Sequence, residues 1–170
     1  MGPWGALIMG FFGSGFFVAA SVQQGGWRNP LIIAPALVFA GLALTAWRMI
    51  ATAAPSAYSP SPAAEKVISR ATMFEAIGVP VVAIGLANTG HAALVMPGVA
   101  AVVGLHFIPM GWAIPFRPFF GLAVAILVAS GAGFALPQPT GSIVAGFIAA
   151  LALWTASVLA LRRARGAVAA

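Results

Sequence analysis

Six long apolar segments, separated by short stretches that contain proline, glycine or polar residues, dominate this sequence. Each segment is about 20 residues long, which is the length that an α-helix needs to cross a hydrocarbon core of about 30 Å. The sequence therefore predicts an all-α polytopic membrane protein, a bundle of six transmembrane helices within a single domain that covers residues 1–170. The expected spans are residues 4–22, 31–50, 66–86, 91–112, 119–136 and 141–161.

The composition excludes an ordinary soluble domain. Hydrophobic residues make up 62% of the chain and charged residues only 6%, and the mean hydropathy is +1.05. A net charge of +6 would suit a nucleic-acid partner, but the basic residues stand singly or in threes at the ends of apolar runs. Such positions are typical of topology anchors. We therefore expect the lipid bilayer, and no nucleic acid, as a partner.

The basic residues also predict the orientation of the chain. With six spans, both termini, the turn at Arg117 and the Ala-, Ser- and Pro-rich linker at residues 51–64 share one side of the membrane. The other side has only Arg28. The positive-inside rule therefore predicts that both termini and the linker are cytoplasmic. The basic residues on that side are Arg48, Lys66, Arg70, Arg117, Arg162, Arg163 and Arg165.

A weak internal symmetry suggests two inverted halves of three helices each. In both halves an apolar span leads into a short turn with a lone arginine beside a proline, at Arg28 and at Arg117. Inverted repeats are typical of transporters, whose binding sites lie near the midplane where the halves meet. The same pattern also arises by chance whenever helices alternate with turns.

Glu75 is an acidic residue inside a predicted span. It follows Lys66 by about nine residues, or about 14 Å of helix, which places it near the middle of the membrane. A carboxylate is costly there, so its side chain is expected to face the bundle interior or water. Thr72 shares that face by the three-residue spacing of a helix. Pro80 leaves the carbonyl group of Ala76 without its usual donor, which adds a free acceptor beside the acid.

His106 is expected at a comparable depth on the next, antiparallel span. It follows His91 by about 15 residues, or about 22 Å along a helix of about 30 Å. A hydrogen bond to Glu75, direct or through water, is therefore geometrically reasonable. One interpretation is a proton-exchanging pair or a ligand site. The other is a neutral histidine and a protonated glutamate that hold two helices together, worth about 1 kcal/mol. We favour the first, because ionisable groups at this depth more often serve function.

Two sets of candidate residues follow. Arg117, between two prolines near the cytoplasmic interface, joins Glu75, His106 and Thr72 in a predicted substrate or proton site, although a topology anchor is the simpler interpretation of this arginine. A weaker set of residues at the opposite end of the spans would line an outer mouth. A helix cap is the simpler interpretation of two of these residues, Asn88 and His91. This set comprises Arg28, Asn88 and His91.

No pattern in the sequence indicates catalysis, a metal site or a cofactor. The chain has no cysteine, so a metal site lacks a ligand cluster. Both histidines lie on one predicted span, so a haem at either one would need a further axial ligand from a methionine or a symmetry mate. No serine stands in a triad context, and no glycine-rich phosphate loop follows a strand. We therefore expect no catalytic residue, no bound metal and no cofactor.

Two segments resemble a functionally uncharacterised family of small bacterial six-helix membrane proteins. They are Phe74-Glu75-Ala76-Ile77-Gly78 and, one span later, Gly104-Leu105-His106-Phe107-Ile108-Pro109, with an arginine before the next span. The resemblance covers about residues 71–120. It departs after Pro109, where Met110-Gly111-Trp112 replaces the leucine, alanine and arginine of the family, so a second basic residue is absent. The resemblance implies a bacterial inner membrane and points to Glu75, His106 and Arg117, but it supplies no reaction.

These observations support three functional hypotheses. The leading one is a transporter or channel for a small solute or ion, coupled to protons through Glu75 and His106. The second is a non-catalytic scaffold or accessory subunit, because glycine-rich helix faces can pack against a second copy or a partner membrane subunit. The third, an intramembrane enzyme that acts on a lipid or a quinone, has no residue pattern that names a substrate.

Overall fold

The structure, a computed structural model, describes residues 2–52 and 60–168. Within these residues the chain forms six α-helices and two short 3₁₀ turns, and no strand. All six helices are long and apolar enough to cross a membrane, which confirms the predicted all-α six-helix bundle. The elements are α1 (Pro3–Gly25), η1 (Pro30–Ile32), α2 (Ile33–Thr52), α3 (Pro62–Asn88), η2 (Ala92–Leu94), α4 (Val95–Ala113), α5 (Pro118–Ala135) and α6 (Thr140–Val168).

The third helix begins earlier than the predicted span because Ser61 caps it. The Ser61 side chain accepts a hydrogen bond of 3.2 Å from the backbone N–H of Ala64, and Pro62 occupies the first helical turn, where its missing N–H costs nothing. Both ends of the predicted linker at residues 51–64 are therefore helical. The middle of the predicted linker, residues 53–59, lies outside the described residues.

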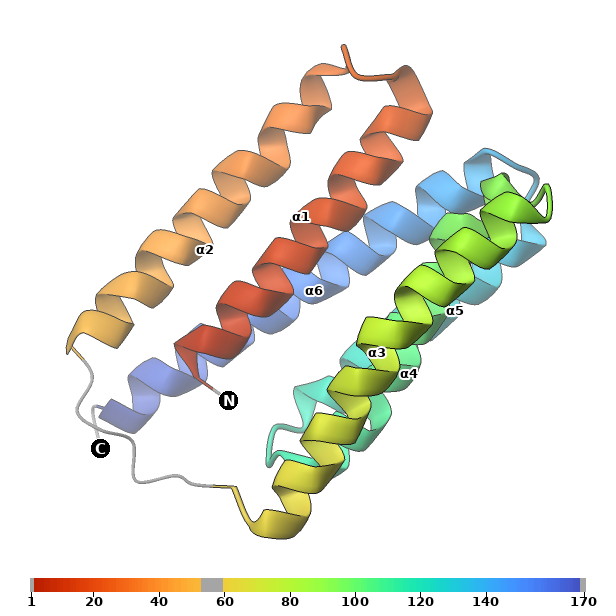
Figure 1. The fold of residues 1–170 in the computed structure, drawn as a ribbon. Helices are drawn as coiled ribbons and strands as arrows, with labels where there is room; N and C mark the ends of the chain where they lie inside the picture. Colours follow the sequence, from red (N-terminus) through yellow and green to blue (C-terminus); the bar gives the residue numbers. More distant parts are fainter. Residues whose placement is uncertain (1, 53–59, 169–170) are drawn as a thin grey trace.

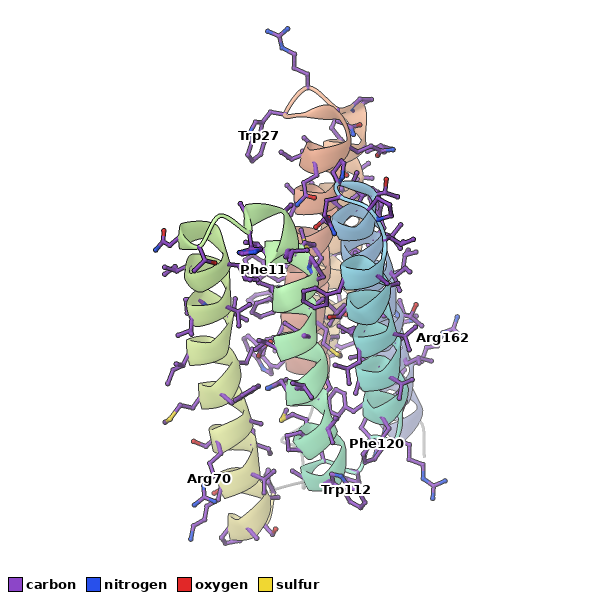
Figure 2. All side chains as sticks on the ribbon, turned by 90° about the vertical axis from the view of Figure 1, so that its right-hand side faces the viewer. Phe11, Trp27, Arg70, Trp112, Phe120 and Arg162 are labelled. Carbon is purple, nitrogen blue, oxygen red and sulfur yellow. The ribbon has the colours of Figure 1, made fainter. Side chains whose placement is uncertain are left out.

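The helices alternate in direction, so the start of α1 and the end of α6 lie at the same end of the bundle, together with the end of α2 and the start of α3 (Figure 1). Figure 2 shows Trp27 at one end of the molecule and Arg70 and Trp112 toward the other. Exposed tryptophans at both ends suit the two interfaces of a bilayer, where indole rings are enriched.

The helices pack as a sequence of neighbours that does not follow chain order. Helix α2 packs on α1, α1 on α6, α6 on α5, α5 on α4 and α4 on α3, while α4 also touches α6. Helices α2 and α3 therefore lie at the two edges of the bundle (Figure 1). Among the described residues α5 and α6 pack closely, whereas α2 and α3 do not, so the helix pairings of the two halves differ.

Small residues bring α4, α5 and α6 into close contact. A Cβ atom at Gly133 of α5 would lie 2.7 Å from Cβ of Pro97 in α4 and 2.8 Å from Cβ of Ala145 in α6. In lipid, helices associate through such van der Waals contacts because the surroundings are as apolar as the side chains. The same close approach joins α1 to α6, where a Cβ atom at Gly13 would meet the ring of Trp154 at 2.8 Å.

Serine hydroxyls reinforce the same crossing. Pro97 has no N–H to give to the carbonyl group of Ala93, and the hydroxyl of Ser142 in α6 donates to that carbonyl instead. The hydroxyl of Ser130 in α5 donates to the carbonyl of Pro97 at 2.8 Å. Hydroxyl groups from two neighbouring helices thus donate hydrogen bonds to the backbone carbonyl groups around this proline. Within a membrane such carbonyl groups need a donor from the protein, because no water is available.

We predict that Gly133→Ala lowers the free energy of unfolding by about 1–3 kcal/mol, because a methyl group at this crossing forces its neighbours to shift. Chemical denaturation of the purified protein in detergent micelles, followed by circular dichroism, measures the change. Gly131→Ala on the same helix is the matched control, since a Cβ atom there meets open space among the described residues. Equal effects of the two substitutions would contradict the packing described for this crossing.

Candidate functional site

Glu75 is the central residue of α3, and its side chain is 15% exposed. The structure turns this side of the helix toward the bundle: Ala71 is buried, and Gly78 and Val82 pack against Val102 and Gly98 of α4. The glycines Gly78 and Gly98 let α3 and α4 approach each other closely. Glu75, which lies between Ala71 and Gly78 on this side of α3, therefore faces the bundle and not the lipid.

His106 is fixed by a hydrogen bond to the backbone of α3. The residue is 5% exposed, and its Nδ1 atom lies 2.9 Å from the carbonyl oxygen of Ala71. A carbonyl oxygen can only accept, so the proton of this hydrogen bond belongs to Nδ1. Ala71 precedes Glu75 by one helical turn, so the bond holds the imidazole ring beside the acid.

The other ring nitrogen faces the carboxyl group. The Nε2 atom of His106 lies 3.7 Å from Oε2 of Glu75, which is close enough for an ion pair but longer than a direct hydrogen bond. Because Nδ1 is already engaged, Nε2 is the nitrogen that gains or loses a proton. In the electrically neutral state the pair therefore holds one exchangeable proton, either on the carboxyl group or on Nε2.

The pair lies at a cleft of about 350 Å³. Helices α1 and α3 form its walls, with Met9 and Phe12 on one side and Thr72 and Glu75 on the other, and side chains of α4 and α6 form its floor. Figure 1 shows α1 and α3 on either side of α6. The surface of the cleft is almost wholly apolar apart from the groups around Glu75.

The residue that carries the predicted free acceptor on α3, Ala76, lines this cleft. Pro80 and Ala76 both line it, and proline at position 80 cannot donate to the carbonyl group of Ala76. The polar side chains of α3 that line the cleft are Glu75 and Thr72, and Thr72 is exposed.

Arg117, the fourth predicted member of the site, lies elsewhere. It precedes the first residue of α5, it is exposed, and it does not belong to the described lining of the cleft. Its position just outside a helix of the bundle suits the anchor that the sequence offers as the simpler interpretation.

The predicted outer-mouth residues are all exposed and also lie apart from the described cleft lining. Asn88 is the last residue of α3, and the Nδ1 atom of His91 lies 3.3 Å from the hydroxyl oxygen of Thr89 in the following turn. Gly90 makes this turn with a φ of +80°, and the N–H of His91 donates to the carbonyl of Leu86. Arg28 belongs to a different turn, between α1 and η1.

Several residues that shape the cleft or the turn at Arg117 leave no signal in the sequence. Met9 and Phe12 of α1 and Leu153 of α6 line the cleft although they lie far from Glu75 in the chain. Arg163 of α6 donates to the carbonyl of Pro115, and its guanidinium carbon lies 5.7 Å from the ring centre of Phe116, so it fixes the turn between α4 and α5. All these contacts depend on which helices are neighbours.

A second groove, of about 670 Å³, lies between α1 and α2. Its described lining includes Ser14, Gln23 and Trp27 but no ionisable side chain, so it offers no acid–base chemistry. Among residues 2–52 and 60–168, no three histidine, cysteine or acidic side chains gather as a metal site would require. The cleft at Glu75 is therefore the candidate functional site.

The six apolar helices and the enclosed acid–histidine pair define the class of the molecule: a polytopic membrane protein with an ionisable site inside its bundle. Comparison of the chain with protein-family models, with curated proteins and with solved structures finds no match. Membership of the bacterial family that the two sequence segments resemble stays a prediction.

We predict that His106→Asn and Glu75→Gln are coupled by about 1 kcal/mol in a double-mutant cycle of unfolding free energies, the scale of polar contacts between membrane helices. Asparagine at position 106 keeps an N–H donor near the place of Nδ1 but has no counterpart of Nε2, so the cycle isolates the contact with the acid. Denaturation in detergent micelles measures the four proteins. The control cycle uses Glu65→Gln, at the exposed start of the same helix. Additive effects for Glu75 would show that the pair does not interact.

Proposed function

We propose that this protein is a transporter or channel for a small solute or ion, coupled to protons through Glu75 and His106. The observation that carries the proposal is the acid–histidine pair at a cleft in the middle of the bundle. Ionisable groups inside a membrane are costly and usually mark pathways for ions, protons or substrates. A pair that served only to join two helices would not need an adjoining cleft.

The geometry supports proton exchange without movement of the imidazole ring. The bond from Nδ1 to Ala71 keeps His106 in place while Nε2 changes its protonation state. The proton leaves or reaches Nε2 through the carboxyl group of Glu75, 3.7 Å away. Thr72, which is exposed and lines the cleft beside Glu75, offers a hydroxyl group to a solute.

We further propose that the protein lies in a bacterial inner membrane with both termini in the cytoplasm. The positive-inside rule supports this orientation, because seven of the eight basic residues belong to the end of the bundle that holds the termini. In this orientation Arg117 lies at the cytoplasmic interface. Arg28, Asn88 and His91 then lie at the turns on the opposite, outer side.

The exposed face of α3 is also compatible with the second candidate, a scaffold or accessory subunit. The outer face of α3 carries a row of large apolar side chains that are 58–61% exposed. Lipid, a second copy of this chain or a partner membrane subunit would cover such a face equally well. In this case Glu75→Gln would reduce stability or partner binding and leave flux unchanged. The row consists of Met73, Ile77, Val81 and Ile84.

We predict that Glu75→Gln abolishes solute-driven collapse of a pH gradient across proteoliposomes, because the glutamine amide cannot exchange the proton. Pyranine trapped inside the vesicles reports the internal pH while amino acids, sugars, amines and inorganic ions are added one at a time. The wild-type protein should respond to at least one of these solutes.

The matched control is Glu65→Gln, which removes the other acidic side chain of the chain at an exposed position of the same helix. It should respond as the wild type does. If a correctly folded Glu75→Gln protein retains the full response, the proton-coupled role of Glu75 is wrong. If the wild-type protein responds to no solute, the scaffold proposal takes precedence.

A further inference from the structure

The charge of the cleft depends on a single proton. Of the described side chains that line it, only Glu75 and His106 are ionisable; α1 contributes Met9 and Phe12, and α6 contributes Leu153, none of which titrates. Arg70, the nearest basic residue along α3, is exposed and outside the lining. With one proton the pair is neutral overall, and without it the cleft carries one negative charge.

A bare negative charge in an apolar cleft is expensive, so whatever replaces the proton has to carry a positive charge. The deprotonated cleft and a monovalent cation form a neutral unit, as the protonated cleft does without a ligand. Proton and cation are therefore alternative occupants of the same site.

The walls favour an organic cation over a metal ion. Calcium binds six to eight oxygens and magnesium six, whereas the described side chains that line the cleft offer only the Glu75 carboxyl group and the Thr72 hydroxyl group as oxygen ligands, with the imidazole of His106 as a nitrogen ligand. Phe12 and Phe107 add aromatic rings, whose faces attract organic cations. A cation with an apolar body is the ligand that matches both the charge and the walls.

The cleft is also open toward the bilayer. Its two walls, α1 and α3, are not packed against each other along their length in the described part of the chain, since α1 packs on α6 and α3 on α4. Phe12 and Ile8 at the α1 wall are 39% and 56% exposed. A volume of about 350 Å³ falls within the range of roughly 300–1,000 Å³ found for small-molecule sites. A membrane-soluble ligand can therefore enter sideways.

We propose that the cleft binds a monovalent organic cation with an apolar body, which enters from the bilayer between α1 and α3 and displaces one proton from the pair of Glu75 and His106. This inference rests on the proposed function and names its substrate class. The exchange balances: one cation enters the cleft, one proton leaves it, and the charge of the site stays the same.

The test measures binding of tetraphenylphosphonium and of the smaller benzyltrimethylammonium to the full chain in lipid nanodiscs. We expect saturable binding of at least one of them, release of about one proton per cation in weakly buffered solution, and an affinity that rises about tenfold per pH unit while the pair still holds its proton. Tetraphenylborate, which has nearly the shape of tetraphenylphosphonium but the opposite charge, should not bind saturably.

Two pairs of variants locate the site. Glu75→Gln should lose at least tenfold in affinity, and Glu65→Gln should not. Val79→Phe should also lose binding, because Val79 lines the cleft and the larger ring fills it while Glu75 remains. Val81→Phe, on the 61% exposed outer face of the same helix, is its control.

Three results would overturn the inference: equal saturable binding of tetraphenylborate, full binding by folded Glu75→Gln and Val79→Phe, or no saturable binding of either cation. The proposed function fails separately. Gradient collapse with another solute, but no cation binding, removes only the substrate class. Cation binding with proton release, but without flux across proteoliposomes, supports the inferred site and removes transport.

Discussion

The hydrogen bond from Nδ1 of His106 to the carbonyl oxygen of Ala71 is the interaction on which the site depends. It joins α4 to α3 at the level of Glu75, and it decides which ring nitrogen carries a fixed proton. Because the bond engages Nδ1, the nitrogen that faces the acid is free to exchange its proton. Without this bond the ring could turn, and the pair would have no defined exchangeable proton.

The remainder of the bundle keeps that bond enclosed. Small residues bring α3 onto α4 and α5 onto α6, and serine hydroxyls satisfy the backbone where Pro97 interrupts it. In a membrane these contacts replace the hydrophobic drive that would hold a soluble core together. The cleft lies beside this packed region because α1 packs on α6 and α3 packs on α4, which leaves space between α1 and α3.

The number of helices and the common level of Glu75 and His106 on neighbouring helices could be predicted from the sequence, because apolar length and the rise of a helix determine both. The partner of Nδ1 could not, since a backbone carbonyl leaves no mark in the sequence. The cleft walls at Met9 and Phe12, and the contact of Arg163 with the turn at Pro115, depend on α1 and α6 being neighbours of particular helices. The lone-arginine turns suggested equivalent halves, but helix pairing in the bundle is set by close contacts of small side chains.

The most direct measurement of the central claim is nitrogen-15 NMR of labelled histidine in the variant His91→Gln, which leaves His106 as the single histidine of the chain. We predict that Nδ1 carries a proton at every pH at which the protein is folded, and that Nε2 is the nitrogen that exchanges its proton, with a response that changes in Glu75→Gln. A neutral ring protonated on Nε2 would contradict this prediction, because Nδ1 could then not donate to Ala71.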